Sequence, residues 1–121
     1  MALVIGVAVA GGLGTLARYG ISNVFHGDAL PWATVAINVF GSFLLGVLVI
    51  VPHDWLSESS RTTLGVGLLG GFTTFSTFSV QAFLDFEAGE PAKALLYVAA
   101  SVLLGIAAAT AGYYAARAAF H

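Results

Sequence analysis

The sequence predicts an all-α integral membrane protein with four transmembrane helices, the third of them broken. The composition is the first reason: 59% of the 121 residues are hydrophobic and 8% are charged, whereas a soluble domain carries about 25% charged residues. The second is that prolines and charged residues gather in three short segments between four apolar stretches. Each stretch is close to the ~20 residues that a spanning helix needs. At this length we expect a single membrane domain, 1–121.

The polar segments set the expected limits of the spans at about 2–22, 32–51, 62–84 and 92–117. The first stretch resembles a signal peptide, but no lysine or arginine precedes it and its apolar run continues too far, so we expect it to be retained as a span. Tryptophan and tyrosine near span ends are typical of membrane interfaces. The residues concerned are Tyr19, Trp32, Trp55, Tyr113 and Tyr114.

The positive charges predict no preferred orientation in the membrane. Four spans place both termini on one side, with Arg61 and Arg117, and leave Arg18 and Lys93 on the other. Orientation follows the lysine and arginine bias of short loops, and here the two sides are equal. We therefore expect chains to insert both ways up and to pair as an antiparallel, dual-topology homodimer. The alternative is that the N-terminal amine or the lipids fix one orientation.

Small residues recur on two spans at the spacing that permits close helix packing. Gly67 and Gly71 form a GxxxG pair, and Ser101, Gly105 and Ala109 follow one another at steps of four. Such faces let backbones approach in lipid, where packing drives association. Because four thin helices shelter a polar pathway poorly, this pattern also favours a dimer.

The run 70–79, GGFTTFSTFS, is the strongest candidate for a functional site. Glycine and threonine make it a poor continuous helix, and interrupted backbone at membrane depth is tolerated only inside protein or beside a wet cavity. Phe75 and Phe78 share a helical face, and their positive ring edges can stabilise a small anion weakly. Carbonyls turned inward near Gly70, Gly71 and Thr73 suit a cation such as Na⁺.

Three further polar residues lie inside the spans, and each has two interpretations. Arg18 is either an arginine that reaches the interface or part of an electropositive vestibule for an anion. Asn38 and Ser42 lie one turn apart on the second span. Asn38 is equally consistent with a contact between helices and with a pore lining, because its amide offers two N–H donors to an anion.

Several functions are excluded by what the sequence lacks. Without cysteine there are no disulfides or thiolate sites. No acidic residue lies deep in a span, and no carboxylate pair, metal-ligand set or Ser/His/Asp arrangement is present, so we expect no enzyme. A net charge of −2 without a basic tract gives no reason to expect a nucleic-acid partner.

Three motifs together resemble the Fluc (CrcB-type) fluoride channels: GGLGTLARY at 11–19, INVFGSF at 37–43 and GGFTTFSTFS at 70–79. The last motif, in a four-span chain of this length, is highly specific, and the resemblance covers all four spans. It implies a dual-topology homodimer in the plasma (inner) membrane, with two antiparallel pores that export cytoplasmic F⁻ passively. Membrane lipid and fluoride are then the other partners.

The resemblance also implies roles for individual residues. A structural Na⁺ at the dimer centre would be held by main-chain carbonyls, which Gly70 and Thr73 match. Arg18 matches the arginine of the first motif. The family's pore asparagine, pore phenylalanines, neighbouring hydroxyl residues and span-four polar track are matched by Asn38, Phe75, Phe78, Thr74, Ser76, Thr77, Tyr97 and Ser101.

The chain departs from the family pattern at three positions. The polar track on span four continues in the family at steps of four, but here the next two steps are Gly105 and Ala109. Many members carry a glutamate shortly after the phenylalanines, where this chain has Gln81. The exit route and the transport rate are therefore left open by the sequence.

Two other functions compete with the channel. A small proton-coupled multidrug exporter of the SMR type would need a membrane-embedded glutamate in span one, but no acidic residue precedes Asp28. A non-transporting subunit of a membrane assembly would leave the alternation of phenylalanine with threonine and serine without a purpose. The sequence therefore favours the channel.

Overall fold

The computed structural model describes residues 1–121, apart from the side chain of Asp28. Three spans are continuous helices: α1 (Ala2–Ser22), α2 (Leu30–Ile50) and α6 (Pro91–Phe120). A short 3₁₀ turn, η1 (Gly27–Ala29), precedes α2. The third span is composite. It consists of α3 (Glu58–Thr62), the π-helix η2 (Thr63–Leu69), α4 (Gly70–Phe72) and α5 (Phe75–Glu87).

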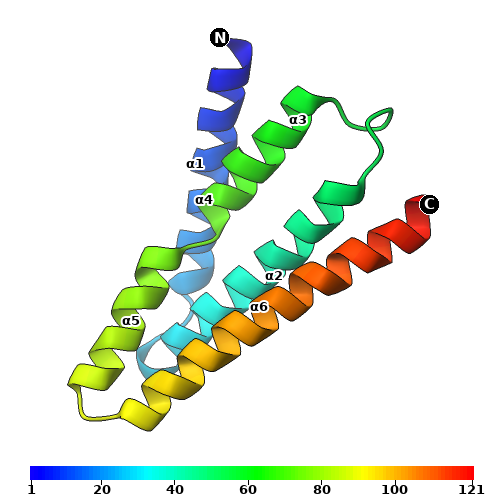
Figure 1. The fold of residues 1–121 in the computed structure, drawn as a ribbon. Coiled ribbons are helices and arrows are strands. Elements are labelled where there is room, and N and C mark those ends of the chain that lie inside the picture. The colour runs from blue at the N-terminus through cyan, green and yellow to red at the C-terminus, as the bar shows by residue number, and fades with distance from the viewer.

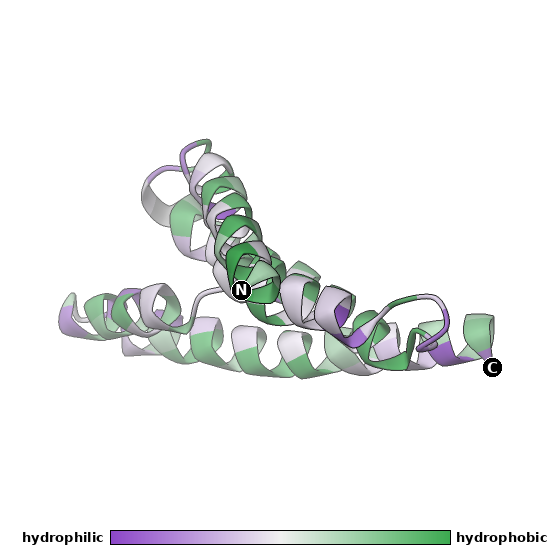
Figure 2. Cartoon of the chain, turned by 90° about the horizontal axis from the view of Figure 1, so that it is seen from above, coloured by the Kyte–Doolittle hydropathy of each residue, from purple (hydrophilic) through white to green (hydrophobic). Residues whose placement is uncertain are grey.

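Four helical segments are long and apolar enough to cross a bilayer, and the part of the chain that the structure describes contains no strand. The expected all-α membrane class is thus confirmed. The two chain ends and the 51–57 connection lie toward one end of the molecule, and the 23–29 and 88–90 connections lie at the other (Figure 1). In Figure 2 hydrophilic residues gather at the ends of the helices, and apolar residues cover most of their length, as lipid contact requires.

The helices pack in two main pairs. α2 lies along α6 for most of its length, and α1 lies against η2 and α4 (Figure 1). Beyond the break that follows α4, α5 leaves α1 and packs on α6 instead. The third span therefore joins the two pairs, and the point where it changes partner is the run 70–79.

The structure differs from the sequence prediction at both ends of the third span, where 57–61 and 85–91 were expected to be loops. α3 begins at Glu58 because the Ser57 side chain caps it, accepting a hydrogen bond from the Ser60 N–H at 3.2 Å. α5 continues to Glu87, and the turn comes at Gly89, whose φ of +80° favours glycine. Polar residues thus extend these helices beyond their apolar parts.

Arg61 fixes the terminus-side end of α2. Its Nη1 donates a hydrogen bond to the Leu48 carbonyl at 2.8 Å, and its Nη2 donates to the Val51 carbonyl. Carbonyls in the last turn of a helix have no partner within it, and a basic side chain there also suits the helix dipole. Arg61 therefore ties α3 to α2 across the 51–57 connection.

The GxxxG glycines of the third span pack against α1 of the same chain. A Cβ added to Gly67 would come within 3.0 Å of the Val7 carbonyl oxygen, and one added to Gly71 would collide with the Gly11 carbonyl. From the other side, a Cβ on Gly14 would collide with the Leu68 carbonyl. Close approach of the two backbones therefore requires glycine at these positions.

The α2–α6 pair also depends on glycines that let the two backbones approach closely. A Cβ on Gly46 would collide with the Ala109 carbonyl, and one on Gly112 would collide with the Phe43 carbonyl. Ala109 belongs to the small-residue series that the sequence identified on span four, and its backbone is the surface that Gly46 meets.

We predict that Gly14→Ala destabilises the fold whereas Gly12→Ala does not. The added methyl group at Gly14 has to displace the backbone of the third span, an overpacking that costs about 1–3 kcal/mol. A Cβ at Gly12 meets nothing within 4 Å, so alanine there gains helix propensity. Thermal unfolding midpoints of the two purified variants in one detergent provide the comparison, and equal midpoints would contradict the close α1–η2 contact.

Candidate functional site

The third span opens between α4 and α5. α4 ends at Phe72 and α5 begins at Phe75, and the two residues between them have extended backbone. Thr73 has φ −86° and ψ 159°, and Thr74 has φ −149° and ψ 122°. Because extended residues leave the helical hydrogen-bond ladder, the peptide groups around them need other partners.

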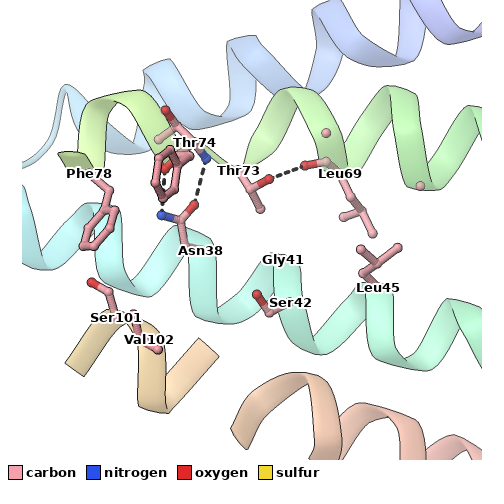
Figure 3. Close-up of a pocket in the computed structure, with 13 residues that line it drawn as sticks. Asn38, Gly41, Ser42, Leu45, Leu69, Thr73, Thr74, Phe78, Ser101 and Val102 are labelled. Atoms are coloured by element: carbon pink, nitrogen blue, oxygen red, sulfur yellow. Dashed lines mark hydrogen bonds between the residues drawn. The ribbon is translucent and has the colours of Figure 1, made fainter. Parts of the chain in front are cut away.

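Asn38 of α2 provides partners for the Thr74 peptide groups. Its Nδ2 donates a hydrogen bond to the Thr74 carbonyl at 2.9 Å, and its Oδ1 accepts one from the Thr74 N–H at 2.8 Å (Figure 3). Of the two interpretations of Asn38, the interhelical contact is thus present. An amide NH₂ group carries two N–H donors, so one remains for another acceptor.

The break releases carbonyls of the 70–73 segment from the helical ladder, among them those of Gly70 and Thr73. In a continuous helix the Thr74 N–H would bond to the Gly70 carbonyl, and the Thr77 N–H would bond to the Thr73 carbonyl. The first N–H donates to Asn38 instead, and the second donates to the Thr74 hydroxyl oxygen at 3.2 Å, which caps α5. The carbonyls of Gly70 and Thr73 therefore lose their i+4 donors.

A third carbonyl at the break is held by α1. The Gly71 carbonyl accepts a hydrogen bond from Arg18 Nε at 3.2 Å and a longer one from the Thr15 hydroxyl at 3.5 Å. Arg18 therefore contacts the break itself, a role that neither interpretation of the sequence included.

A groove of about 340 Å³ lies beside the break, between α2, the third span and α6 (Figure 3). Most of the site residues expected from the sequence line it: Asn38, Ser42, Gly70, Thr73, Thr74, Phe75, Phe78 and Ser101. Four others do not: Arg18, Ser76, Thr77 and Tyr97. Ser76 is exposed on α5, and the Thr77 hydroxyl accepts a hydrogen bond from that of Thr74 at 3.1 Å.

The two phenylalanine rings of the groove have different surroundings. Phe78 is half-buried and contacts Tyr97, with ring centroids 5.2 Å apart. Phe75 contacts Phe78 at 5.8 Å, but 80% of its surface is exposed. Packing within one chain therefore accounts for Phe78 and not for Phe75.

Ser101 brings a free hydroxyl group to the groove. Its Oγ is buried, and among the described residues it has no hydrogen-bond partner. Buried polar atoms are nearly always paired, so this hydroxyl is available to a small ligand. In Figure 3 it lies at the same end of the groove as Phe78 and Asn38.

Gly41 is a further residue of the site, which was not expected from the sequence. A Cβ at this position would collide with the Thr73 methyl group, so glycine lets the break approach α2 closely. The sequence pattern could have indicated this role, because Gly41 follows Asn38 by three residues and so lies on the same helical face. The apolar lining residues Leu45, Leu69 and Val102 carry no comparable signal, since leucine and valine occur throughout the spans.

We predict that Asn38→Ala destabilises the break. It leaves the N–H and the carbonyl of Thr74 unpaired, at about 1–3 kcal/mol for each group. Hydrogen exchange at Thr74 and the thermal unfolding midpoint are the measurements. Ser42→Ala, one turn further along α2 on the same groove, is the control. Unchanged exchange in Asn38→Ala would mean that this amide does not hold the break.

The chain is similar in sequence to known proteins of one family. Residues 5–113 match the family described as CrcB-like protein, Camphor Resistance (CrcB). A fluoride-specific ion channel FluC of Rhodospirillum centenum is 46% identical over 118 residues, which is 93% of either chain. One of Thermus thermophilus is 42% identical over 111 residues, 88% of this chain and 89% of its own. One of a Methylobacterium species is 49% identical over 105 residues, 84% and 85% respectively.

These matches extend over the α1 motif, the Asn38 region of α2, the break and most of α6. Four of its helical segments are long and apolar enough to cross a bilayer, which indicates that the chain lies in a membrane. The chain is a multi-pass membrane protein, and it belongs to the CrcB family.

Proposed function

We propose that the chain is a fluoride-selective channel that exports cytoplasmic F⁻ passively, and that it is not an enzyme. One observation carries the proposal: Phe75 and Phe78, just after the break, and the unpaired Ser101 hydroxyl of α6 line the same groove. The relatives named as fluoride-specific ion channels support the choice of ion.

The groups on the groove suit a small anion that has to move on. Ser101 Oγ–H and the second Nδ2–H of Asn38 are hydrogen-bond donors, and the ring edges of Phe75 and Phe78 are weakly positive. Conduction requires that each site bind the ion well enough to admit it and weakly enough to release it. None of the described residues that line the groove carries a full positive charge, so the ion meets weak sites there.

Passive movement is sufficient for protection against fluoride. Fluoride crosses a membrane as neutral HF from an acidic exterior, ionises in the less acidic cytoplasm and is trapped there as the anion. A pathway for F⁻ alone then lets it leave down its own gradient. The proposed channel therefore needs no membrane-embedded carboxylate for proton coupling.

The working unit that we propose is an antiparallel, dual-topology homodimer with two pores. The even division of Arg61 and Arg117 against Arg18 and Lys93 supports insertion both ways up. The exposure of Phe75 supports a partner, because a ring that serves a pore needs protein on its open side. The groove beside the break would then be closed by the second chain.

We propose further that a structural Na⁺ lies at the centre of this dimer, held by the Gly70 and Thr73 carbonyls. Both carbonyls have lost their i+4 donors at the break, so their oxygens are free for a hard cation, which prefers oxygen ligands. Two carbonyls from each chain around a two-fold axis would supply four oxygens. The Gly71 carbonyl does not join them in this proposal, because Arg18 holds it.

The channel proposal predicts rapid F⁻ efflux from liposomes that contain the purified protein, with little Cl⁻ efflux. Phe75→Ile and Phe78→Ile should each reduce F⁻ efflux at least tenfold while the dimer still elutes intact, because an aliphatic side chain fills similar space without a positive ring edge. An ion-selective electrode measures the rates, and Val80→Ile, an exposed position on the same helix, is the control.

Three results would contradict this function. Cl⁻ efflux as fast as F⁻ efflux would show that the protein does not select fluoride. F⁻ efflux only under a proton gradient would indicate a coupled transporter. Unchanged efflux in both phenylalanine variants would make the two rings packing residues.

The Na⁺ proposal predicts that the thermal unfolding midpoint of the dimer rises with Na⁺ at constant ionic strength. Ligand present at 100 times its Kd adds about 2.7 kcal/mol of stability. The comparison medium replaces Na⁺ by N-methyl-D-glucamine, a cation too large for four carbonyls. A midpoint that does not depend on this exchange would overturn the proposed site.

A further inference from the structure

The series of hydroxyl groups on α6 ends just beyond the groove beside the break. Tyr97, Ser101, Gly105 and Ala109 follow one another at steps of four on α6, so they share one helical face. The first two carry a hydroxyl group, and the last two do not. An anion that moved along this face past Ser101 would therefore meet no side-chain donor on it, and a charge without partners is costly inside a membrane protein.

Ser42 of α2 brings a hydroxyl group to the place where α6 lacks one. A Cβ added to Gly105 would lie 3.9 Å from Ser42 Oγ, so a side chain at position 105 would point toward this oxygen. In Figure 3 Ser42 lies further along α2 than Asn38, toward Leu45 and away from the end of the groove that holds Ser101. The hydroxyl series thus changes helix at this level of the membrane.

The Ser42 hydroxyl is not occupied by the helix to which it belongs. The hydroxyls of Thr34, Ser79 and Thr110 donate to the carbonyl four residues earlier, at 3.4, 2.9 and 2.8 Å, which is a common arrangement for serine and threonine in membrane helices. Ser42 is half-buried and makes no such bond to Asn38, nor to any other described residue. Its O–H is therefore free to donate to a ligand.

Ser42 also lines a second groove, which we call the α2–α6 groove. This groove has a volume of about 540 Å³, and it shares Ser42 and Leu45 with the groove beside the break. Tyr113 and Tyr114 line it toward the terminus-side end of α6, and tyrosines of this kind gather where a span reaches the membrane surface. The two grooves therefore adjoin at Ser42, and the second leads toward the interface.

We propose that fluoride passes from the groove beside the break into the α2–α6 groove, and that Ser42 donates the hydrogen bond that carries it past Gly105. The inference rests on the proposed channel function. It assigns this step to a hydroxyl of α2 instead of α6, and it places the tyrosine hydroxyls at the end of the path. One neutral donor at each step lets the ion enter and leave without being held.

The first test removes the Ser42 hydroxyl. Ser42→Ala should slow the initial F⁻ efflux from liposomes about tenfold, because a hydrogen bond to a charged group is strong enough to change a rate by this order. The thermal unfolding midpoint should stay the same, since the hydroxyl has no partner among the described residues. Ser59→Ala, at an exposed serine on α3, is the matched control and should keep the wild-type efflux.

The second test returns a hydroxyl to α6. Gly105→Ser in the Ser42→Ala background should restore most of the F⁻ efflux, because a Cβ at position 105 faces the Ser42 position and has room there. Gly105→Ala in the same background adds the Cβ without the hydroxyl and should leave efflux slow. An ion-selective electrode measures the rates, and gel filtration checks that each dimer is intact.

The outcomes separate this inference from the channel function. If the wild type moves no F⁻, the proposed function itself fails. If the wild type and Ser42→Ala move F⁻ equally fast, the channel stands and the inference is overturned. Failure of Gly105→Ser to restore efflux would overturn it as well. So would equal restoration by Gly105→Ser and Gly105→Ala, because filled space and not a hydroxyl would then be what the path needs.

Discussion

The structure depends on one constraint: backbone polar groups inside a bilayer need partners within the protein. At Thr73 and Thr74 the third span leaves the helical hydrogen-bond ladder. One side chain from another span supplies partners for the exposed peptide groups of Thr74. Asn38 pairs with the N–H and the carbonyl of Thr74 together. Arg18 takes the Gly71 carbonyl, and the carbonyls of Gly70 and Thr73, which the break also releases, are those proposed to bind a cation.

Glycine contacts bring these partners within reach. Gly14 and Gly71 set α1 directly against the third span, and Gly41 admits Thr73 to the surface of α2. Interiors are close-packed, so a shift of one methyl group is felt by its neighbours. The same contacts that hold the helices together therefore determine where the groove lies and which groups line it.

The sequence predicted the helical class, the four spans and most of the groove residues, because hydropathy and the 70–79 motif are local signals. It predicted loops at 57–61 and 85–91, where the helices of the third span in fact continue. The Ser57 cap starts the helix at Glu58, and the turn comes only at Gly89, although the flanking residues are polar. The sequence contained no sign of the π-helix over Thr63–Leu69. The pairing of Asn38 with Thr74 joins positions 36 residues apart, and one sequence alone does not reveal such a contact.

The order of Asn38 and Thr74 along the chain also matters during biosynthesis. The ribosome makes α2 before the third span, so the Asn38 amide has left the ribosome when the opened peptide groups of Thr74 emerge. Those groups can then enter lipid with a hydrogen-bonding partner already synthesised. If the third span preceded α2, its interrupted backbone would reach the bilayer unpaired, at a cost of several kcal/mol for each group. The sequence order of the spans thus protects the break at the moment of insertion.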